Sequence, residues 1–132
     1  MQAADVVAFS ERRVTELSGG ERSRVALARV LAVEAPVILA DEPTSSLDPR
    51  HQLDVLQTLR AAADKGALVI VVTHDLGLAA RFSDTVLVLC EGRMVSQAPP
   101  IEALSQQVMA EVFRISAYRA EYQRQTVIVP WA

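Results

Sequence analysis

The stretch that decides the fold is VILADEPTSSLD, residues 37–48. Its apolar start, residues 37–40, has no polar alternation, which predicts a strand buried on both faces, as in a parallel sheet. Asp41 and Glu42 follow at the strand's carboxyl end, where open α/β sheets bind their ligands. Neighbouring side chains on a strand point in opposite directions, so one carboxylate is available for a metal ion and the other for a proton. An isolated acidic pair is more often a solvated turn, so the flanking residues must decide between the two interpretations.

The composition indicates a globular chain of one domain. Its 132 residues are 51% apolar and 22% charged, which is typical of a packed core. The net charge of -3 provides no basic field for phosphates and argues against a nucleic-acid partner. Cys90 is the only cysteine, which excludes an intrachain disulfide and fits a reducing compartment. There is no signal pattern and no apolar run of membrane-spanning length, so we expect a cytoplasmic chain whose membrane role depends on partners.

A helix start precedes the deciding stretch. Ser18 is a favourable N-cap, and Glu21 lies three residues later, where a capping box requires it. Gly19 and Gly20 would let another group approach the backbone closely, and the amides of a helix start favour an anion. An ordinary capped helix, running to about residue 34, is the alternative interpretation of this segment.

The remaining elements alternate between strand and helix patterns. Asp48 is the expected N-cap of a helix that ends near Lys65, with Gly66 as its C-cap. The expected later elements are a strand at 67–72, a helix at 75–82, a hairpin of 85–89 and 93–96, helical segments at 102–104 and 107–113, and a last strand at 126–129. We expect Trp131 to be a packing residue rather than a ligand contact.

This order predicts an α/β fold with a mostly parallel sheet flanked by helices, a C-terminal hairpin and a helical tail. Two of the expected parallel strands end in polar residues: Asp41-Glu42 and Thr73-His74. Since the ends of parallel strands lie side by side, we expect both acids and the His74 imidazole at one cleft. A lone histidine after a strand is usually structural, and it is the acidic pair that makes His74 a candidate.

At this point the sequence resembles a known family, the ATP-binding cassette (ABC) ATPases. Residues 17–21, LSGGE, resemble the signature motif, and residues 37–42 resemble the Walker B strand with its catalytic glutamate. Ser46-Leu47-Asp48 resembles the D-loop and His74 the switch histidine. The four motifs occur in the family order and at typical spacing, and the resemblance extends from about Val14 to Val95.

The resemblance implies a role for each matching residue. Asp41 would hold Mg²⁺ through water, and Glu42 would act as general base on the attacking water. His74 would contact the γ-phosphate, and Asp48 would reach across a dimer interface. Ser18, Gly19, Gly20 and Glu21 would close on ATP held by a second subunit of a head-to-tail pair.

One departure from the family pattern limits what this chain does alone. A phosphate-binding loop needs Gly-x-x-x-x-Gly-Lys-Ser/Thr, and the only lysine is Lys65, which precedes Gly66. We therefore interpret the chain as the C-terminal half of a cassette: 1–34 from the helical subdomain, 35–98 from the Walker B and switch core, and 99–132 as tail. Alone, we expect it to lack ATP binding and hydrolysis and to self-associate through exposed edges and apolar surface.

The tail is similar to that of cassettes that import iron-siderophore, haem or cobalamin complexes. GRMV at 92–95, PP at 99–100 and EVF at 111–113 carry this similarity. The implied function is the ATPase subunit of an import transporter, using ATP and Mg²⁺ and attached to membrane-spanning permease subunits at the inner face of the membrane. The alternative is a non-enzymatic half-cassette that pairs with a partner supplying the phosphate loop.

Overall fold

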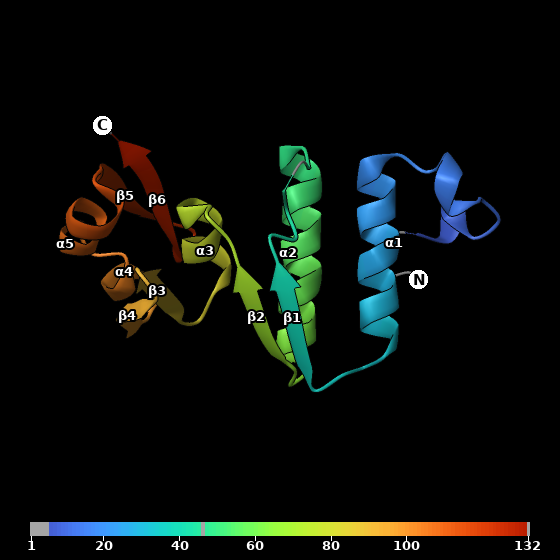
Figure 1. The fold of residues 1–132 in the computed structure, drawn as a ribbon, viewed down its shortest axis with the longest axis horizontal. Coiled ribbons are helices and arrows are strands. Elements are labelled where there is room, and N and C mark those ends of the chain that lie inside the picture. The colour runs from blue at the N-terminus through green and yellow to red at the C-terminus, as the bar shows by residue number, and fades with distance from the viewer. Residues whose placement is uncertain (1–5, 46, 132) are drawn as a thin grey trace. The chain divides into compact units, whose positions relative to one another are not determined.

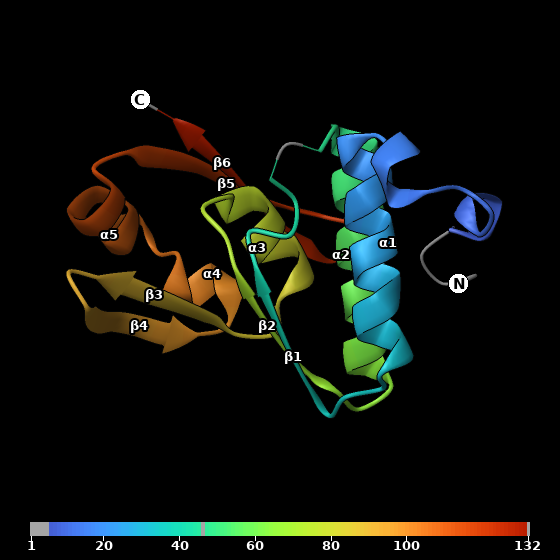
Figure 2. The same cartoon turned by 45° about the vertical axis from the view of Figure 1, so that its right-hand side comes forward.

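The computed structural model describes residues 6–45 and 47–131. They form two compact units, of which the first ends at Thr73 and the second begins at His74. Figure 1 and Figure 2 show the elements of each unit. None of the helices within these ranges has the length and apolar character that a membrane span requires.

The first unit is built around a parallel strand–helix–strand crossover. Two short 3₁₀ turns, η2 (Val7–Phe9) and η3 (Val14–Glu16), precede helix α1 (Gly19–Ala32). Strand β1 (Val37–Asp41), helix α2 (Pro49–Asp64) and strand β2 (Leu68–Val72) follow, and Figure 2 shows β1 and β2 side by side. The strands pair in parallel from Val37 opposite Leu68 to Asp41 opposite Val72. The predicted parallel pairing is therefore confirmed.

Helix α2 packs on one face of this two-stranded sheet. Its buried residues are Val55, Leu56 and Leu59, and Ile38 of β1 is buried with them. The sequence predicted burial on both faces of β1, and that prediction is wrong for this chain, because Leu39 is 74% exposed. The exposed apolar face of the sheet consists of Val37, Leu39, Leu68, Ile70 and Val72. We call these five residues the aliphatic face.

The second unit combines two antiparallel hairpins with short helices. Its elements are α3 (Leu76–Phe82), β3 (Val86–Cys90), β4 (Arg93–Ala98), α4 (Pro100–Ala103), α5 (Gln106–Val108), the π-helical turn η4 (Met109–Phe113), β5 (Ser116–Tyr122) and β6 (Gln125–Trp131). Strand β3 pairs with β4, and β5 pairs with β6. The core consists of Ala80, Val88, Leu104, Met109 and Ile128.

The second unit agrees with the sequence in its first half and departs from it at the end. The β3–β4 hairpin is confirmed, and its turn residues Glu91 and Gly92 both have positive φ, as a tight hairpin turn requires. Strand β5 was not predicted, because its segment mixes charged and aromatic residues. Trp131 is 66% exposed, so the expectation that it is a packing residue is wrong for the described part of this unit. It lies at the end of β6, on the face opposite the one that contacts the core.

Candidate functional site

The two acids lie at the carboxyl end of β1, as the sequence predicts. Asp41 is the last residue of the strand and lies opposite Val72 of β2. Glu42 continues the ladder by one bond, because its amide donates to the Val72 carbonyl at 2.9 Å. Both residues are exposed. The backbone of the pair is therefore fixed to the sheet, while both residues remain accessible to solvent.

Glu42 has an unusual backbone conformation, with a φ of 43°. A residue with a side chain rarely adopts this left-handed region, and the strain costs on the order of 1–3 kcal/mol. Such strain is concentrated at functional sites, where it fixes the direction of a side chain. Nothing in the sequence indicated this conformation, since Glu42 is neither a glycine nor an asparagine.

The segment after Glu42 is held by Thr44, which sequence reasoning did not select. Thr44 is buried, and its carbonyl accepts from the Leu47 amide and from Gln52 Nε2, both at 3.3 Å. Ser46, the first residue of the predicted D-loop, lies outside the described residues. The turn is thus anchored to α2 through Gln52.

Asp48 caps helix α2, as the sequence predicts. Its Oδ1 accepts from the amides of Arg50 at 3.1 Å and His51 at 3.2 Å. Its Oδ2 is bonded to Nδ1 of His51. The His51 side chain and then these amides lower the pKa of the Asp48 carboxyl. All these bonds are made to its own helix, so the structure gives Asp48 a capping role, and its reach toward another subunit stays a prediction.

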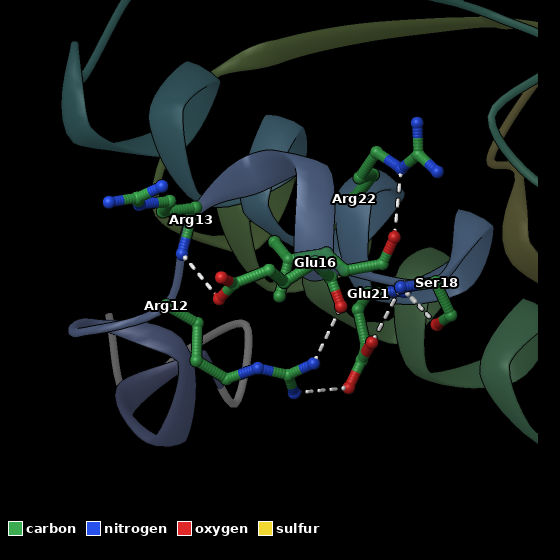
Figure 3. Close-up of polar contacts among 7 residues, drawn as sticks. Arg12, Arg13, Glu16, Ser18, Glu21 and Arg22 are labelled. Atoms are coloured by element: carbon green, nitrogen blue, oxygen red, sulfur yellow. Dashed lines mark hydrogen bonds and ion pairs between the residues drawn. The ribbon is translucent and has the colours of Figure 1, made fainter.

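The signature segment forms the N-terminus of α1 (Figure 3). The Ser18 hydroxyl accepts from the Glu21 amide at 3.3 Å, and the Glu21 carboxylate accepts from the Ser18 amide at 2.7 Å. This reciprocal pair is the predicted capping box. The amides of Gly19 and Gly20 fall in the first turn, where a helix offers no carbonyl acceptor. Together with the helix dipole they favour an anion there.

Arginine side chains brace this turn, a feature that sequence reasoning missed (Figure 3). Arg12 Nη1 donates to Glu21 Oε1 at 3.0 Å, and its Nη2 donates to the Glu16 carbonyl at 2.7 Å. Arg22 Nε donates to the Leu17 carbonyl at 3.0 Å. The Ser18 amide, the Ser18 hydroxyl and Arg12 lower the pKa of Glu21, in that order. The turn is thus preorganised before any ligand arrives.

The start of α1 also approaches the predicted D-loop. A Cβ on Gly20 would lie 3.7 Å from Leu47 Cδ2, an ordinary van der Waals distance. Two of the predicted motifs are therefore neighbours within the first unit. The surroundings of Gly20 would admit a side chain, so the close approach of a ligand to the backbone remains the reason to expect glycine at this position.

His74 opens the second unit, one residue after Thr73 and two after the end of β2. It is exposed. Asp41 and Glu42 belong to the first unit, so the convergence of the imidazole with the acids stays a prediction. A hollow of about 1120 Å³ lies between α1 and α2, and its lining includes Arg24, Leu31 and Asp54. None of the predicted site residues lines it.

The donor set fits Mg²⁺ only as part of a larger site. Within residues 6–45 and 47–131, no three His, Cys, Asp or Glu residues gather into a metal site. Mg²⁺ is usually held by one or two carboxylates together with substrate phosphates and water. Asp41 at the strand end can supply one such carboxylate.

Comparison with known proteins was made at the level of family, sequence and structure. Residues 1–45 match the family model described as ABC transporter. The chain is 50% identical over 86% of its length to the Hemin import ATP-binding protein HmuV of Rhodococcus jostii. It is 48% identical over 92% of its length to the protein of the same name from Pseudomonas fluorescens. The chain spans 39% and 50% of the length of these two relatives.

Solved structures agree with these matches. A metal-chelate type ABC transporter in an inward-facing conformation superposes on the whole chain with a TM-score of 0.85 at 28% identity, and the chain covers 55% of it. The dimeric ATP-binding cassette MJ0796, bound to ADP and phosphate, superposes on 75% of the chain with a TM-score of 0.63 at 35% identity, and 44% of it is covered. The α/β cassette fold predicted from the sequence is confirmed.

Proposed function

Because this chain belongs to the ABC transporter ATPase family, we propose that it supplies the catalytic glutamate and the signature turn of an ATPase that drives import. The observation that carries the proposal is the end of β1, where two adjacent carboxylates leave one strand of a parallel pair. The second support is the preorganised helix start at Ser18, whose free amides suit a phosphate.

Each residue has a role that its geometry permits. Glu42, exposed and fixed by its amide to β2, accepts a proton from the attacking water. Asp41 would hold, through water, the Mg²⁺ that accompanies ATP, and this ion would supply neutralisation of charge on the phosphates. His74 orients the γ-phosphate and the water. Ser18, Gly19 and Gly20 bind the γ-phosphate of ATP held by a second subunit, with Glu21 keeping the turn in shape.

The proposed assembly follows from what the chain lacks and what it exposes. No phosphate-binding loop occurs in the sequence, so the ATP phosphates must be cradled by other residues of the cassette. The aliphatic face offers those residues an apolar surface to pack on. The whole assembly then includes a second ATPase subunit and membrane-spanning permease subunits at the inner face of the membrane.

The cargo we propose is haem or a related metal chelate. The relatives named above are hemin import proteins, and one solved neighbour is of the metal-chelate type. No described residue of the chain contacts cargo in this proposal, since an ATPase subunit acts through the permease. Import assays with haem and with an iron-siderophore complex would separate the two cargoes.

The test of the ATPase proposal replaces Glu42 by Gln in the intact cassette with its permease. We expect turnover to fall by about 10²-fold or more, because the general base is lost, while ATP-bound dimers accumulate. Glu34→Gln is the matched control, since Glu34 also lies in a loop of the first unit and also has positive φ. Unchanged turnover in Glu42→Gln would show that the assignment is wrong.

A second function is favoured by the exposed aliphatic face. A half-cassette with this surface would pair with a partner chain that supplies the phosphate loop, without hydrolysing ATP itself. Calorimetry on the 132-residue chain with Mg-ATP tests an expectation that the two proposals share. We expect no binding by the chain alone under either proposal, and tight binding would contradict both.

A further inference from the structure

The β5–β6 hairpin presents an aromatic face that the proposed ATPase function does not use. Residues directly opposite each other in the hairpin share a face. Arg119 lies opposite Ile128, which is buried in the core of the second unit. The other face includes Tyr118, Tyr122 and Trp131, which are 63%, 68% and 66% exposed. Tyrosine and tryptophan are enriched at protein interfaces.

Strand β5 also has a free edge. Among the described strands it pairs only with β6. The turn residues Gln123 and Arg124 have φ of 51° and 61°, which is the geometry of a two-residue hairpin turn. The flanking residues of such a turn face each other in the ladder, and hydrogen bonding alternates along the strand. The amides of Ala117, Arg119 and Glu121 therefore point away from β6.

The sequence of this edge is symmetric about Ala120. It reads Tyr118-Arg119-Ala120-Glu121-Tyr122. A second copy, paired antiparallel about a two-fold axis at Ala120, would place its Glu121 opposite Arg119 and its Tyr122 opposite Tyr118. The amides that point outward are those that this register would pair. Opposite charges and aromatic pairs across strands both stabilise a sheet.

Other registers are disfavoured by the same residues. A shift of two residues places Arg119 opposite the second copy's Arg119, or Glu121 opposite its Glu121, and like charges directly opposite each other are destabilising. A shift of one residue moves the aromatic side chains to the other face. The edge therefore selects one pairing.

The Arg119 side chain gives an independent indication of a missing acceptor. Its Nη2 donates to the Ile101 carbonyl. Its Nε is buried and has no hydrogen-bond partner among residues 6–45 and 47–131. A buried donor without an acceptor is unfavourable, because it has lost its hydration and nothing replaces it. The carboxylate of Glu121 from a second copy, opposite Arg119 on the same face, would supply one.

We propose that the β5 edge is the binding surface for a second copy of this chain, in the register with Ala120 on the two-fold axis. Two hairpins then form one four-stranded antiparallel sheet by strand addition. This pairing needs no nucleotide, and it is independent of the proposed ATPase function.

The first test reverses the charges. We expect Arg119→Glu and Glu121→Arg each to weaken self-association of the full chain by roughly tenfold or more, because both cross-strand pairs become repulsive. An equimolar mixture of the two variants restores both pairs and should associate as tightly as the unaltered chain. Sedimentation velocity measures this, and circular dichroism establishes that each variant is folded. Equal association of both single variants and the unaltered chain would overturn the proposal.

The second test uses the symmetry axis and does not depend on charge. With Cys90→Ser as background, Ala120→Cys should form an intermolecular disulfide, since residues on the axis lie about 4.5 Å apart at Cα and disulfides accept about 4.4–6.8 Å. Tyr122→Cys in the same background is the matched control, because it faces the second copy's Tyr118. Non-reducing electrophoresis measures the rate of intermolecular disulfide formation in both variants. Cross-linking of Tyr122→Cys as fast as Ala120→Cys would overturn the register.

Discussion

Two sheet faces of this molecule are apolar and exposed, and they differ in chemistry. The aliphatic face of β1–β2 carries only branched side chains without polar atoms, and Leu39 on it is 74% exposed. The aromatic face of β5–β6 carries Tyr118, Tyr122 and Trp131. Branched aliphatic strands are typical of parallel sheets that are covered on both faces. Tyrosine and tryptophan combine an apolar ring with a polar group that tolerates water.

Two faces with similar exposure can therefore have different roles. In the proposed cassette the aliphatic face would be a core surface covered by further residues, because its side chains gain nothing from water. The aromatic face is stable in water and still able to bind a partner. A substitution that adds a charge should therefore be harmless on one face of the intact protein and harmful on the other.

The largest expected effect tests this difference directly. In the intact cassette, Leu39→Lys should lower the free energy of unfolding by about 3 kcal/mol or more, because an unpaired ammonium is buried. In the 132-residue chain the same change should cost no more than about 0.5 kcal/mol. Trp131→Lys, on the aromatic face but outside the proposed β5 pairing, is the control and should stay within about 0.5 kcal/mol in both. Urea denaturation measures the free energy of unfolding for each substitution in each of the two proteins. Equal losses for Leu39→Lys in both proteins would remove the distinction between the faces.

The second prediction concerns backbone strain at one residue in each unit. Glu42 in the first unit and Arg124 in the β5–β6 turn both have positive φ, of 43° and 61°. Replacement by Gly removes the strain and should raise the free energy of unfolding by up to about 1 kcal/mol at either position. Only Glu42→Gly should abolish ATP turnover of the intact cassette. If Arg124→Gly also lowered turnover, the proposed separation between catalysis at the end of β1 and self-association at β5 would be wrong.

The smallest effect concerns pH and helix caps. The pKa of Asp48 lies below its ordinary value because of His51 and the helix amides, so its contribution to stability is present above its unfolded pKa of about 3.9 and is lost as pH falls through the folded value. Helix α5 of the second unit is capped by the Ser105 hydroxyl, which accepts from the Val108 amide and does not titrate. Asp48→Ser retains a cap and should remove the acid dependence of α2. Thermal melts of Asp48→Ser and of the unaltered chain, followed by circular dichroism from about pH 5 down to about pH 2, would show whether their acid dependence differs.

Local sequence signals predicted the first unit well. Ser18 with Glu21, and Asp48 followed by Pro49, specify helix starts through neighbouring residues alone. The unbroken apolar runs specified β1 and β2. What the sequence did not reveal depends on tertiary surroundings: the positive φ of Glu42, the buried Thr44 and the bracing of Glu21 by Arg12.

The second unit was harder to predict at its end. Strand β5 follows a π-helical turn and alternates apolar and charged residues. Its pairing with β6 depends on the turn at Gln123 and Arg124. Neither turn residue is glycine or asparagine, so the usual hairpin signal is missing. The exposed position of Trp131 was missed for the same reason, since the face of a strand is known only once its partner is known.

The proximity of Gly20 to Leu47 would allow communication between two parts of the proposed site. A Cβ added to Gly20 would lie 3.7 Å from Leu47 Cδ2, so a phosphate bound at the start of α1 would lie near the segment that leads to Asp48. Leu47 is joined through the Thr44 carbonyl to Gln52, and so to the first turns of α2. One subunit would in this way relay the presence of nucleotide through its own first unit, over the two hydrogen bonds that the Thr44 carbonyl accepts.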